Sequence, residues 1–344
     1  MKDKTTAPIF AKAKAMKTHK INSPDLNDSN KLNLNNCEMP EPNMLDAEKT
    51  FQIYELLRPI LPKTRVIKSQ IVGSVRELLD DVDGLILDGY GIINVGEKLT
   101  PEFYDFFSEI CKRKLPFVIL TNGASQHSEK TTQKYQSWGL EINKHDLISS
   151  RDVLEKQLFH ISKRKIMRLN IKTAPLKHCF DFNQSVGRLS NAFHHAEAFA
   201  FMGSIGWTET EQSKFETALK ENPRPVLVAN PDVSAPQKNR FSAEPGYWVI
   251  RAMKQAVFPV EWYGKPYPAS YEMALNTLQK KTNRPLQRSR VAMIGDSLHT
   301  DILGANAAGL MSILVSNYGL MRGLNVLEFC SKMSIHPNFI APIL

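Results

Sequence analysis

Residues Gly84 to Pro101, GLILDGYGIINVGEKLTP, decide the fold. They open with the apolar run Leu85, Ile86 and Leu87 between glycines, which is typical of a strand buried on both faces of a parallel sheet. Asp88 follows at the carboxyl end of this strand, the edge where open α/β sheets bind their ligands. A carboxylate there can act as a covalent nucleophile toward phosphorus. On its own Asp88 is more simply a turn aspartate, so its role depends on partners from elsewhere in the chain.

A second Asp-x-Asp-Gly string lies upstream, at Asp81 and Asp83. The residues before Asp81, VRELLD, are typical of the end of an amphipathic helix, and no buried strand leads into the pair. We therefore place the nucleophile at Asp88.

Length and composition are those of a soluble globular protein. The 344 residues can form one main domain with a smaller inserted one. The hydrophobic fraction of 42% and the charged fraction of 23% are ordinary for that class. No apolar run approaches the roughly 20 residues of a membrane helix, so we expect no membrane partner.

The formal net charge of +9 is concentrated in the N-terminus. Residues 1 to 20 contribute +5 of it, through six lysines and one acid. The basic balance is therefore mainly a property of one tail, and we expect no nucleic-acid partner.

The cysteines and the N-terminus predict a cytoplasmic protein. Four cysteines lie far apart without a Cys-x-x-Cys pair, so we interpret them as reduced thiols. Lysines interrupt the apolar residues at the N-terminus, which argues against a signal peptide. The first arginine is Arg58, which argues against a mitochondrial transit peptide.

The patterns along the chain predict an α/β fold with a doubly wound, Rossmann-like parallel-sheet core. Residues 1–48 contain one aromatic residue and the polar run LNDSNKLNLNN, so we expect a disordered tail. Strand-like and helix-like stretches then alternate to the end of the chain. We place the core in residues 49–149 and 263–344, and an inserted α/β domain in residues 150–262.

Two further strand ends carry polar residues. Thr121, Asn122 and Gly123 end the apolar run of LPFVILTNGASQ, with an ordinary helix cap as the alternative. Asn230 and Asp232 follow PVLVA in a turn that suits a substrate-facing loop.

The last part of the chain supplies one lysine and two acids. Lys265 stands in VEWYGKPYP before a proline that restricts its neighbours, although a lone lysine is usually solvated. In VAMIGDSLHTDILGA a strand ends at Asp296, and Asp301 falls in the first turn of the next helix, where capping is the alternative. Three acids at the strand ends of one sheet favour Mg²⁺. Carboxyl groups of residues 88 and 296 more than about 10 Å apart would exclude a shared ion.

These strings together resemble the haloacid dehalogenase-like superfamily from about residue 70 to 328. Its four motifs occur in order as LILDGYG, VILTNG, YGKP and GDSLHTD. The insertion between the second and third motifs, and the NPD and GKPxP strings, resemble class IIA members, which carry an inserted cap domain of the C2a type.

The resemblance implies a Mg²⁺-dependent phosphatase of a small phosphorylated metabolite. Asp88 would attack phosphorus to form an aspartyl-phosphate, and Lys265 would offset charge on the nucleophile and the phosphoryl group. The implied substrate and phosphate contacts are Thr121, Asn122, Gly123, Lys265, Asn230 and Asp232. The implied metal site comprises Asp88, the backbone carbonyl of Tyr90, Asp296 and Asp301, which would orient Asp296 or the waters on the metal.

Tyr90 departs from the family pattern, which has a general acid two residues after the nucleophile. A tyrosine with a pKa near 10 is a weak base in phosphoenzyme hydrolysis. We therefore expect slow turnover, with a bias toward good leaving groups such as aryl or acyl phosphates. The alternative is a catalytically impaired protein that binds a phosphorylated ligand without turnover. The sequence leaves a homodimer open.

Overall fold

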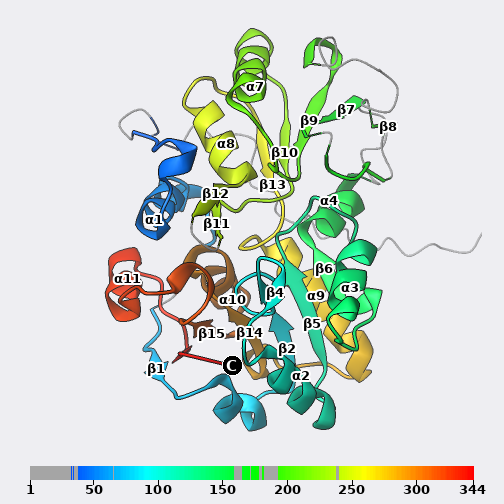
Figure 1. Ribbon diagram of the computed structural model, residues 1–344, viewed down its shortest axis with the longest axis vertical. Coiled ribbons are helices and arrows are strands. Elements are labelled where there is room, and N and C mark those ends of the chain that lie inside the picture. The colour runs from blue at the N-terminus through cyan, green and yellow to red at the C-terminus, as the bar shows by residue number, and fades with distance from the viewer. Residues whose placement is uncertain are drawn as a thin grey trace, which may run out of the picture.

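The computed structural model describes residues 32, 34, 38–64, 66–158, 165–170, 172–177, 180–181, 193–237 and 240–344. Two parallel sheets dominate it, one above the other in Figure 1. Within these residues, no helix combines the length and apolarity needed to cross a membrane.

The larger sheet has seven strands, all paired in parallel, in the order β1-β16-β15-β14-β2-β5-β6. Their bounds are β1 (Gln70–Ile71), β2 (Gly84–Leu87), β5 (Phe117–Thr121), β6 (Leu147–Ser149), β14 (Val291–Gly295), β15 (Met311–Val315) and β16 (Phe339–Ala341). The chain runs outward from β2 through β5 to β6, and from β14 through β15 to β16 on the other side, so the strand order reverses between β2 and β14. The doubly wound core is thereby confirmed, and its reversal point is the place where such sheets bind ligands.

The central strand β2 is buried on both faces, as its apolar run predicts. Leu85, Ile86 and Leu87 are each at most 1% exposed. Ile86 belongs to one hydrophobic cluster, and Leu85 and Leu87 belong to another. Burial of each side chain contributes about 1.5–3 kcal/mol, which fixes the strand that carries Asp88.

Helices cover the larger sheet and the connections between its strands (Figure 1). They are α2 (Phe103–Lys112), α3 (Ser128–Ser137), α4 (Ser150–Leu158), α9 (Pro268–Thr282), α10 (Leu303–Ala308) and α11 (Val326–Met333). Short 3-10 turns are η3 (Arg58–Ile60), η4 (Val75–Asp81), η5 (Lys144–Asp146), η6 (Arg288–Arg290) and η8 (Gly319–Met321). A small hairpin follows Asp88 as β3 (Asn94–Val95) and β4 (Lys98–Leu99). The rejected acid Asp81 ends η4, a 3-10 segment, and does not follow directly on a strand.

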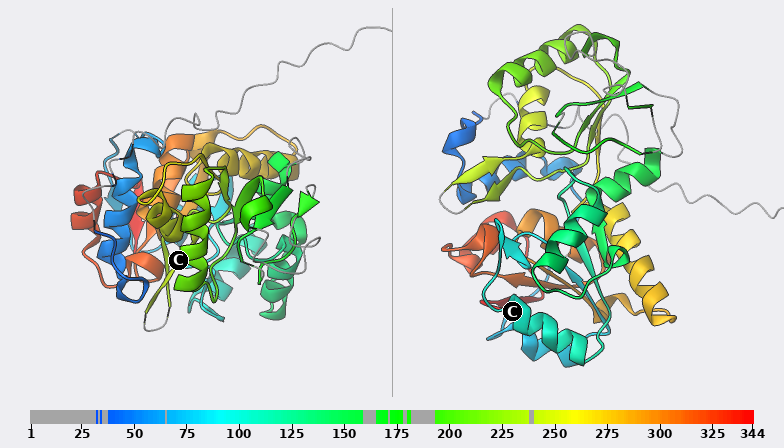
Figure 2. Two further views of the ribbon diagram at one scale, coloured as in Figure 1. Left: turned by 90° about the horizontal axis from the view of Figure 1, so that it is seen from above. Right: turned by 45° about the vertical axis from the view of Figure 1, so that its right-hand side comes forward.

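The second sheet has five parallel strands in the order β13-β10-β9-β7-β8. Their bounds are β7 (Lys165–Arg168), β8 (Phe180–Asp181), β9 (Ala198–Phe201), β10 (Val226–Val228) and β13 (Val260–Trp262), and the accompanying helices are α7 (Glu209–Glu221) and α8 (Pro245–Met253). These strands lie within the proposed inserted domain. An antiparallel hairpin of β11 (Ser234–Pro236) and β12 (Phe241–Ala243) extends to the boundary between the two sheets, where β11 contacts η8 (Figure 2).

The N-terminal segment is ordered earlier than residue 49. It forms η2 (Pro42–Met44) and α1 (Ala47–Leu56), and the side chain of Asp46 caps α1 by accepting a hydrogen bond from the Lys49 backbone at 2.8 Å. The expected disorder is therefore wrong for these residues, because Leu45 and the apolar face of α1 are buried. The first 31 residues of the expected tail lie outside the described residues.

The turn after β14 also differs from expectation. Asp301 lies in a π-helical turn, η7 (Leu298–Ile302), and the α-helix begins only at Leu303. This wider turn points the Asp301 carboxylate back at the strand end, where its hydrogen bonds are made.

Candidate active site

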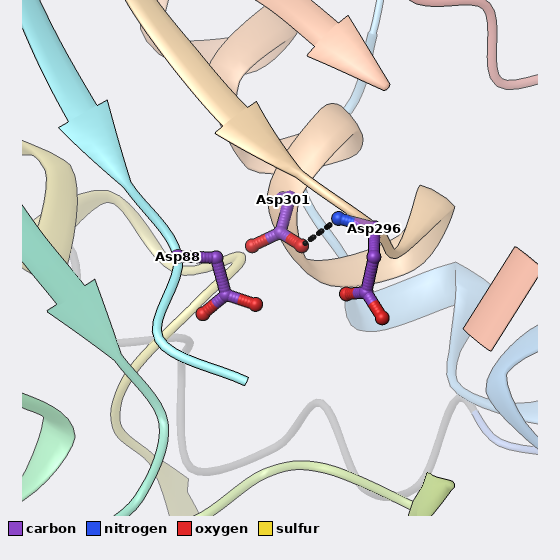
Figure 3. A group of neighbouring side chains, drawn as sticks. All are labelled: Asp88, Asp296 and Asp301. Carbon is purple, nitrogen blue, oxygen red and sulfur yellow. Dashed lines mark hydrogen bonds between the residues drawn. The ribbon is translucent and has the colours of Figure 1, made fainter. Parts of the chain in front are cut away.

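Three acids meet where β2 and β14 end side by side. Leu87 pairs with Ile294, so Asp88 and Asp296 leave the sheet together. One carboxylate oxygen from each of Asp88, Asp296 and Asp301 lies within 4.8 Å of the others, and all three side chains are buried. Figure 3 shows the three carboxylates around one space. This separation is well below the 10 Å that would exclude a shared ion.

Asp301 holds the turn that carries Asp296. Its Oδ2 atom accepts a hydrogen bond from the backbone N–H group of Asp296 at 3.1 Å (Figure 3). The same atom accepts one from the Ser297 backbone N–H, also at 3.1 Å. Its Oδ1 atom accepts a bond from Lys265 Nζ at 2.7 Å. Gly295 permits this approach, since a Cβ there would collide with the Asp301 side chain. Asp301 is therefore a positioning residue rather than an exposed ligand.

Lys265 is the cation of this cluster. It is 2% exposed, and its Nζ atom donates to Asp88 as well as to Asp301. Asn122 fixes its backbone: Oδ1 accepts from Lys265 N at 2.7 Å, and Nδ2 donates to the Lys265 carbonyl at 3.1 Å. The second and third motifs therefore interlock, and the lysine's position depends on Asn122.

The cluster carries more negative charge than Lys265 offsets. Burial, and next the charge of Asp301, raise the pKa of Asp88 against the opposing effect of Lys265. Burial, and next the charges of Asp88 and Asp301, raise the pKa of Asp296 well above its usual range. Carboxylate oxygens with unbalanced negative charge are the donor set that hard divalent cations prefer. The residues present therefore fit such an ion.

The loop after β15 completes the surroundings of Asp296. The Leu320 backbone N–H donates to Asp296 Oδ2 at 2.7 Å. Gly319, at φ +62°, precedes it, and a Cβ there would collide with the same carboxylate. The sequence analysis missed these two residues, although the turn string SNYG after a buried strand was a usable signal.

The Tyr90 hydroxyl is bonded outside the acid cluster. Its hydroxyl donates to the backbone carbonyl of Pro236 in β11, 146 residues later in the chain. Burial raises its pKa further above that of an ordinary tyrosine. The phenol is therefore engaged with the hairpin of the second sheet.

The predicted residues line one cavity of about 720 Å³, with the exception of Asp301 behind its wall. Thr121 ends β5 next to β2, and its Oγ atom accepts a bond from the Gly123 backbone at 3.1 Å. Asn230 Oδ1 accepts from the Asp232 backbone at 3.0 Å. Asp232 Oδ1 accepts from Asn122 Nδ2 at 2.8 Å, which links the second sheet to the core.

Comparison with known proteins agrees with this geometry. Family models match both halves of the core: one described as haloacid dehalogenase-like hydrolase over residues 85–174, and one described as HAD-hydrolase-like over residues 262–341. The first match contains Asp88, and the second contains Asp296 and Asp301. Over these two stretches the chain is similar to the haloacid dehalogenase-like hydrolases.

Relatives of this hydrolase family extend the likeness across the second sheet. An acid sugar phosphatase of Staphylococcus aureus is 24% identical over 267 residues, which are 76% of this chain and 92% of that protein. A possible sugar phosphatase of Cytophaga hutchinsonii has a TM-score of 0.68 at 21% identity, covering 80% of this chain and 98% of that one. A 4-nitrophenylphosphatase of Thermotoga maritima has a TM-score of 0.57 at 22% identity, covering 76% and 95%. These structures share the fold, and their names agree with the class IIA resemblance.

Two residues that line the cavity were not predicted. Tyr54 of α1 and Glu244, the residue before α8, both line the cavity. Tyr54 lies on a helix, and helical periodicity does not tell which surface a helix face meets. Glu244 directly follows β12, but this short strand has no continuous apolar run that would mark its end in the sequence.

Proposed function

We propose that this protein is a Mg²⁺-dependent phosphatase that hydrolyses a small phosphorylated metabolite through an aspartyl-phosphate on Asp88. The observation that carries the proposal is the buried contact of Asp88 with Lys265, beside Asp296, on the wall of one cavity. The likeness to proteins named as sugar and 4-nitrophenyl phosphatases supports it.

Each core residue has a role that follows from its contacts. Asp88 attacks phosphorus, and Lys265 offsets charge on Asp88 and on the phosphoryl group. Thr121, Gly123 and the backbone amide of Asn122 are positioned for the phosphoryl oxygens, while the Asn122 side chain holds Lys265. Such catalysis depends mainly on positioning and electrostatics.

Asp88, Asp296 and the Tyr90 carbonyl would hold Mg²⁺, with Asp301 supporting them from behind. The ion supplies positive charge between the acids and the incoming phosphate. Oxygen ligands of this kind leave several positions for water or phosphate.

Tyr90 makes the reaction slow in this proposal. Its hydroxyl is donated to Pro236 and its pKa is raised, so it is poorly suited to take a proton from water. General acid-base catalysis contributes roughly 10²- to 10⁴-fold. Substrates with good leaving groups, such as aryl or acyl phosphates, depend least on this contribution and should be hydrolysed best.

The second sheet and its hairpin cover the cavity that holds the rest of the substrate. Asn230, Asp232 and Ser204 contribute to its lining, together with the core residues. A cavity of about 720 Å³ suits a small metabolite.

The experiment is a screen of phosphorylated metabolites with Mg²⁺, run on the wild type beside Asp88→Asn and Asp81→Asn. Asp81 is the acid of the upstream string and lies outside the cavity, so it is the matched control. We expect saturable phosphate release, a loss of about 10³-fold or more in Asp88→Asn and no change in Asp81→Asn. A wild type that binds a phosphate ester without releasing phosphate would instead identify a binding protein.

A further inference from the structure

The proposed reaction needs a proton donor for the leaving group and a base for the water that follows. The Tyr90 hydroxyl is engaged with Pro236, so neither task falls to it readily. Two other acids line the same cavity, Asp232 and Glu244. Their hydrogen-bond partners show which of the two acids is held next to the catalytic residues.

Asp232 is tied to the catalytic core. Its Oδ1 atom accepts a bond from Asn122 Nδ2, and the same Nδ2 atom donates to the carbonyl of Lys265. Two hydrogen bonds also fix its backbone. The Asp232 N–H donates to Asn230 Oδ1, and the Asp232 carbonyl accepts from the Gly246 N–H at 3.0 Å. Glu244 bonds to Ser242 and Asn230, which both belong to the second sheet and its hairpin. Of the two acids, Asp232 is therefore the one held next to the phosphate-handling residues.

Tyr54 reaches Asp232 from the N-terminal segment. Its hydroxyl accepts a bond from the Val233 backbone N–H at 3.1 Å, and it lies near enough to the Asp232 carboxylate to lower the pKa of that group. The Tyr54 ring stacks on His299 of the η7 turn, with centroids 5.0 Å apart and planes at 7°. One turn earlier, Thr50 Oγ1 bonds to Ser234 Oγ at 2.7 Å. Helix α1 therefore fastens the Asp232 loop to the core, although it precedes the region that the family models match.

We propose that Asp232 is the general acid and base of the phosphatase reaction, and that Tyr54 is the residue that positions it. This inference rests on the proposed function. In the first step an Asp88 oxygen bonds to phosphorus, the bond from phosphorus to the leaving oxygen breaks, and the proton of Asp232 moves to that oxygen. In the second step Asp232 takes a proton from water, the water oxygen bonds to phosphorus, and the bond from phosphorus to Asp88 breaks. Phosphate leaves, and both carboxyl groups return to their starting states.

The surroundings of Asp232 suit both steps. Burial raises its pKa to about 6, with Asp301 also raising it and with Asn122, Lys265 and Tyr54 lowering it. The charges of Asp88 and Glu244 face it from the core and from the N-terminus of α8. A group with a pKa near the working pH is populated in both forms, as an acid that later serves as a base requires.

The decisive variant is Asp232→Asn, compared with the wild type on p-nitrophenyl phosphate and on glucose 6-phosphate. p-Nitrophenolate leaves without a proton, whereas a sugar alkoxide needs one. We expect kcat/KM for glucose 6-phosphate to fall by about 10²-fold or more and kcat/KM for p-nitrophenyl phosphate to fall by less than about 10-fold. An equal fall for both substrates would assign Asp232 a structural role and overturn the inference. A selective fall in Glu244→Gln or Tyr90→Phe instead would assign the acid to that residue.

Tyr54→Phe tests the positioning role and keeps the inference testable if Asp232→Asn fails to fold. Phenylalanine retains the stacking on His299 but loses the hydroxyl. Because the nearby Tyr54 hydroxyl lowers the pKa of Asp232, its loss should move the falling, alkaline limb of kcat/KM for glucose 6-phosphate to higher pH. Thr50→Val removes the contact with Ser234 and a bond to the Asp46 carbonyl, but no contact with Asp232, and should leave that limb in place. Ionisation of the substrate affects all variants alike. An alkaline limb of kcat/KM that does not move in Tyr54→Phe would therefore overturn the positioning role of Tyr54. A wild type that hydrolyses neither ester would refute the proposed function itself.

Discussion

Replacing Lys265 with methionine tests whether the acid cluster is held together by one buried cation. The Lys265 side chain is nearly inaccessible, and its ammonium donates to Asp88 and Asp301. Asn122 holds both the N–H and the carbonyl of residue 265, so a methionine side chain can occupy the space of the lysine side chain. The substitution therefore removes charge with little change of shape.

The size of the effect follows from the spacing of the acids. Two unit charges 4.8 Å apart repel by about 3.5 kcal/mol at an effective dielectric constant of 20. Removing one partner of a buried ion pair typically costs about 3–5 kcal/mol. We expect a loss of that size in the free energy of unfolding of Lys265→Met at pH 8 with EDTA present.

The loss should be smaller at pH 5. Burial and the neighbouring acids raise the pKa of Asp88 and Asp296 in the folded state. A raised acid pKa favours the folded state at low pH, and this stabilisation is lost as the pH rises through the folded-state pKa. Without Lys265 no buried cation offsets the charges of the acids. The loss in the free energy of unfolding should therefore be larger at pH 8, where more of the acids must ionise, than at pH 5.

Urea unfolding at pH 8 and pH 5 measures both values. Lys332→Met is the control, because the Lys332–Glu48 pair is equally close at 2.6 Å but exposed, and its loss should cost less than about 1 kcal/mol. Adding Asp301→Asn to Lys265→Met should recover part of the stability, since one of the three charges is removed. An equal loss at both pH values without recovery in the double variant would refute the electrostatic account.

Three further outcomes are expected. Arg151→Met should lose about 3–5 kcal/mol in urea unfolding, because its buried guanidinium bonds to Glu155 and to the carbonyls of Ala124 and Ala174; a loss below 1 kcal/mol would contradict this. Mg²⁺ at a hundredfold excess over its Kd should stabilise the wild type by about 2.7 kcal/mol in thermal unfolding, and Asp296→Asn should abolish this gain; an equal gain in the variant would place the ion elsewhere. Tyr90→Asp adds a second carboxyl group for proton transfer to the one proposed at Asp232, so it should raise kcat for glucose 6-phosphate at least about tenfold while Tyr90→Phe does not, measured as phosphate release. No gain in the aspartate variant would show that proton transfer is not limiting.

The strand-end residues were predictable because their signals are local. The runs LIL before Asp88 and VAMI before Asp296 are continuous apolar strands, and parallel pairing of two such strands brings their next residues together. The same reasoning placed Thr121 at the end of the neighbouring strand. Motif order then added Lys265, whose role in the cluster no local pattern indicates.

The rest of the site depends on contacts between distant parts of the chain. The Tyr90 hydroxyl meets a carbonyl 146 residues away, and Val233 meets Tyr54 across 179 residues. Periodicity tells which residues share a helix face, but not which surface that face meets. The π-helical turn around Asp301 was also missed, since its i→i+5 bonding leaves no distinct sequence pattern.

The location of Asp232 makes proton transfer depend on how the two sheets meet. The nucleophile and its lysine belong to the core, whereas the proposed acid stands on the loop after β10 of the second sheet. The Asn122 side chain and the α1 residues Tyr54 and Thr50 fix that loop against the core near the cavity. A substrate that separates the two sheets would break these contacts and move Asp232 away from the leaving group. Asp88 could still attack phosphorus. Selectivity would then appear in kcat for poor leaving groups more than in KM, because the acid contributes only to the step that breaks the ester bond.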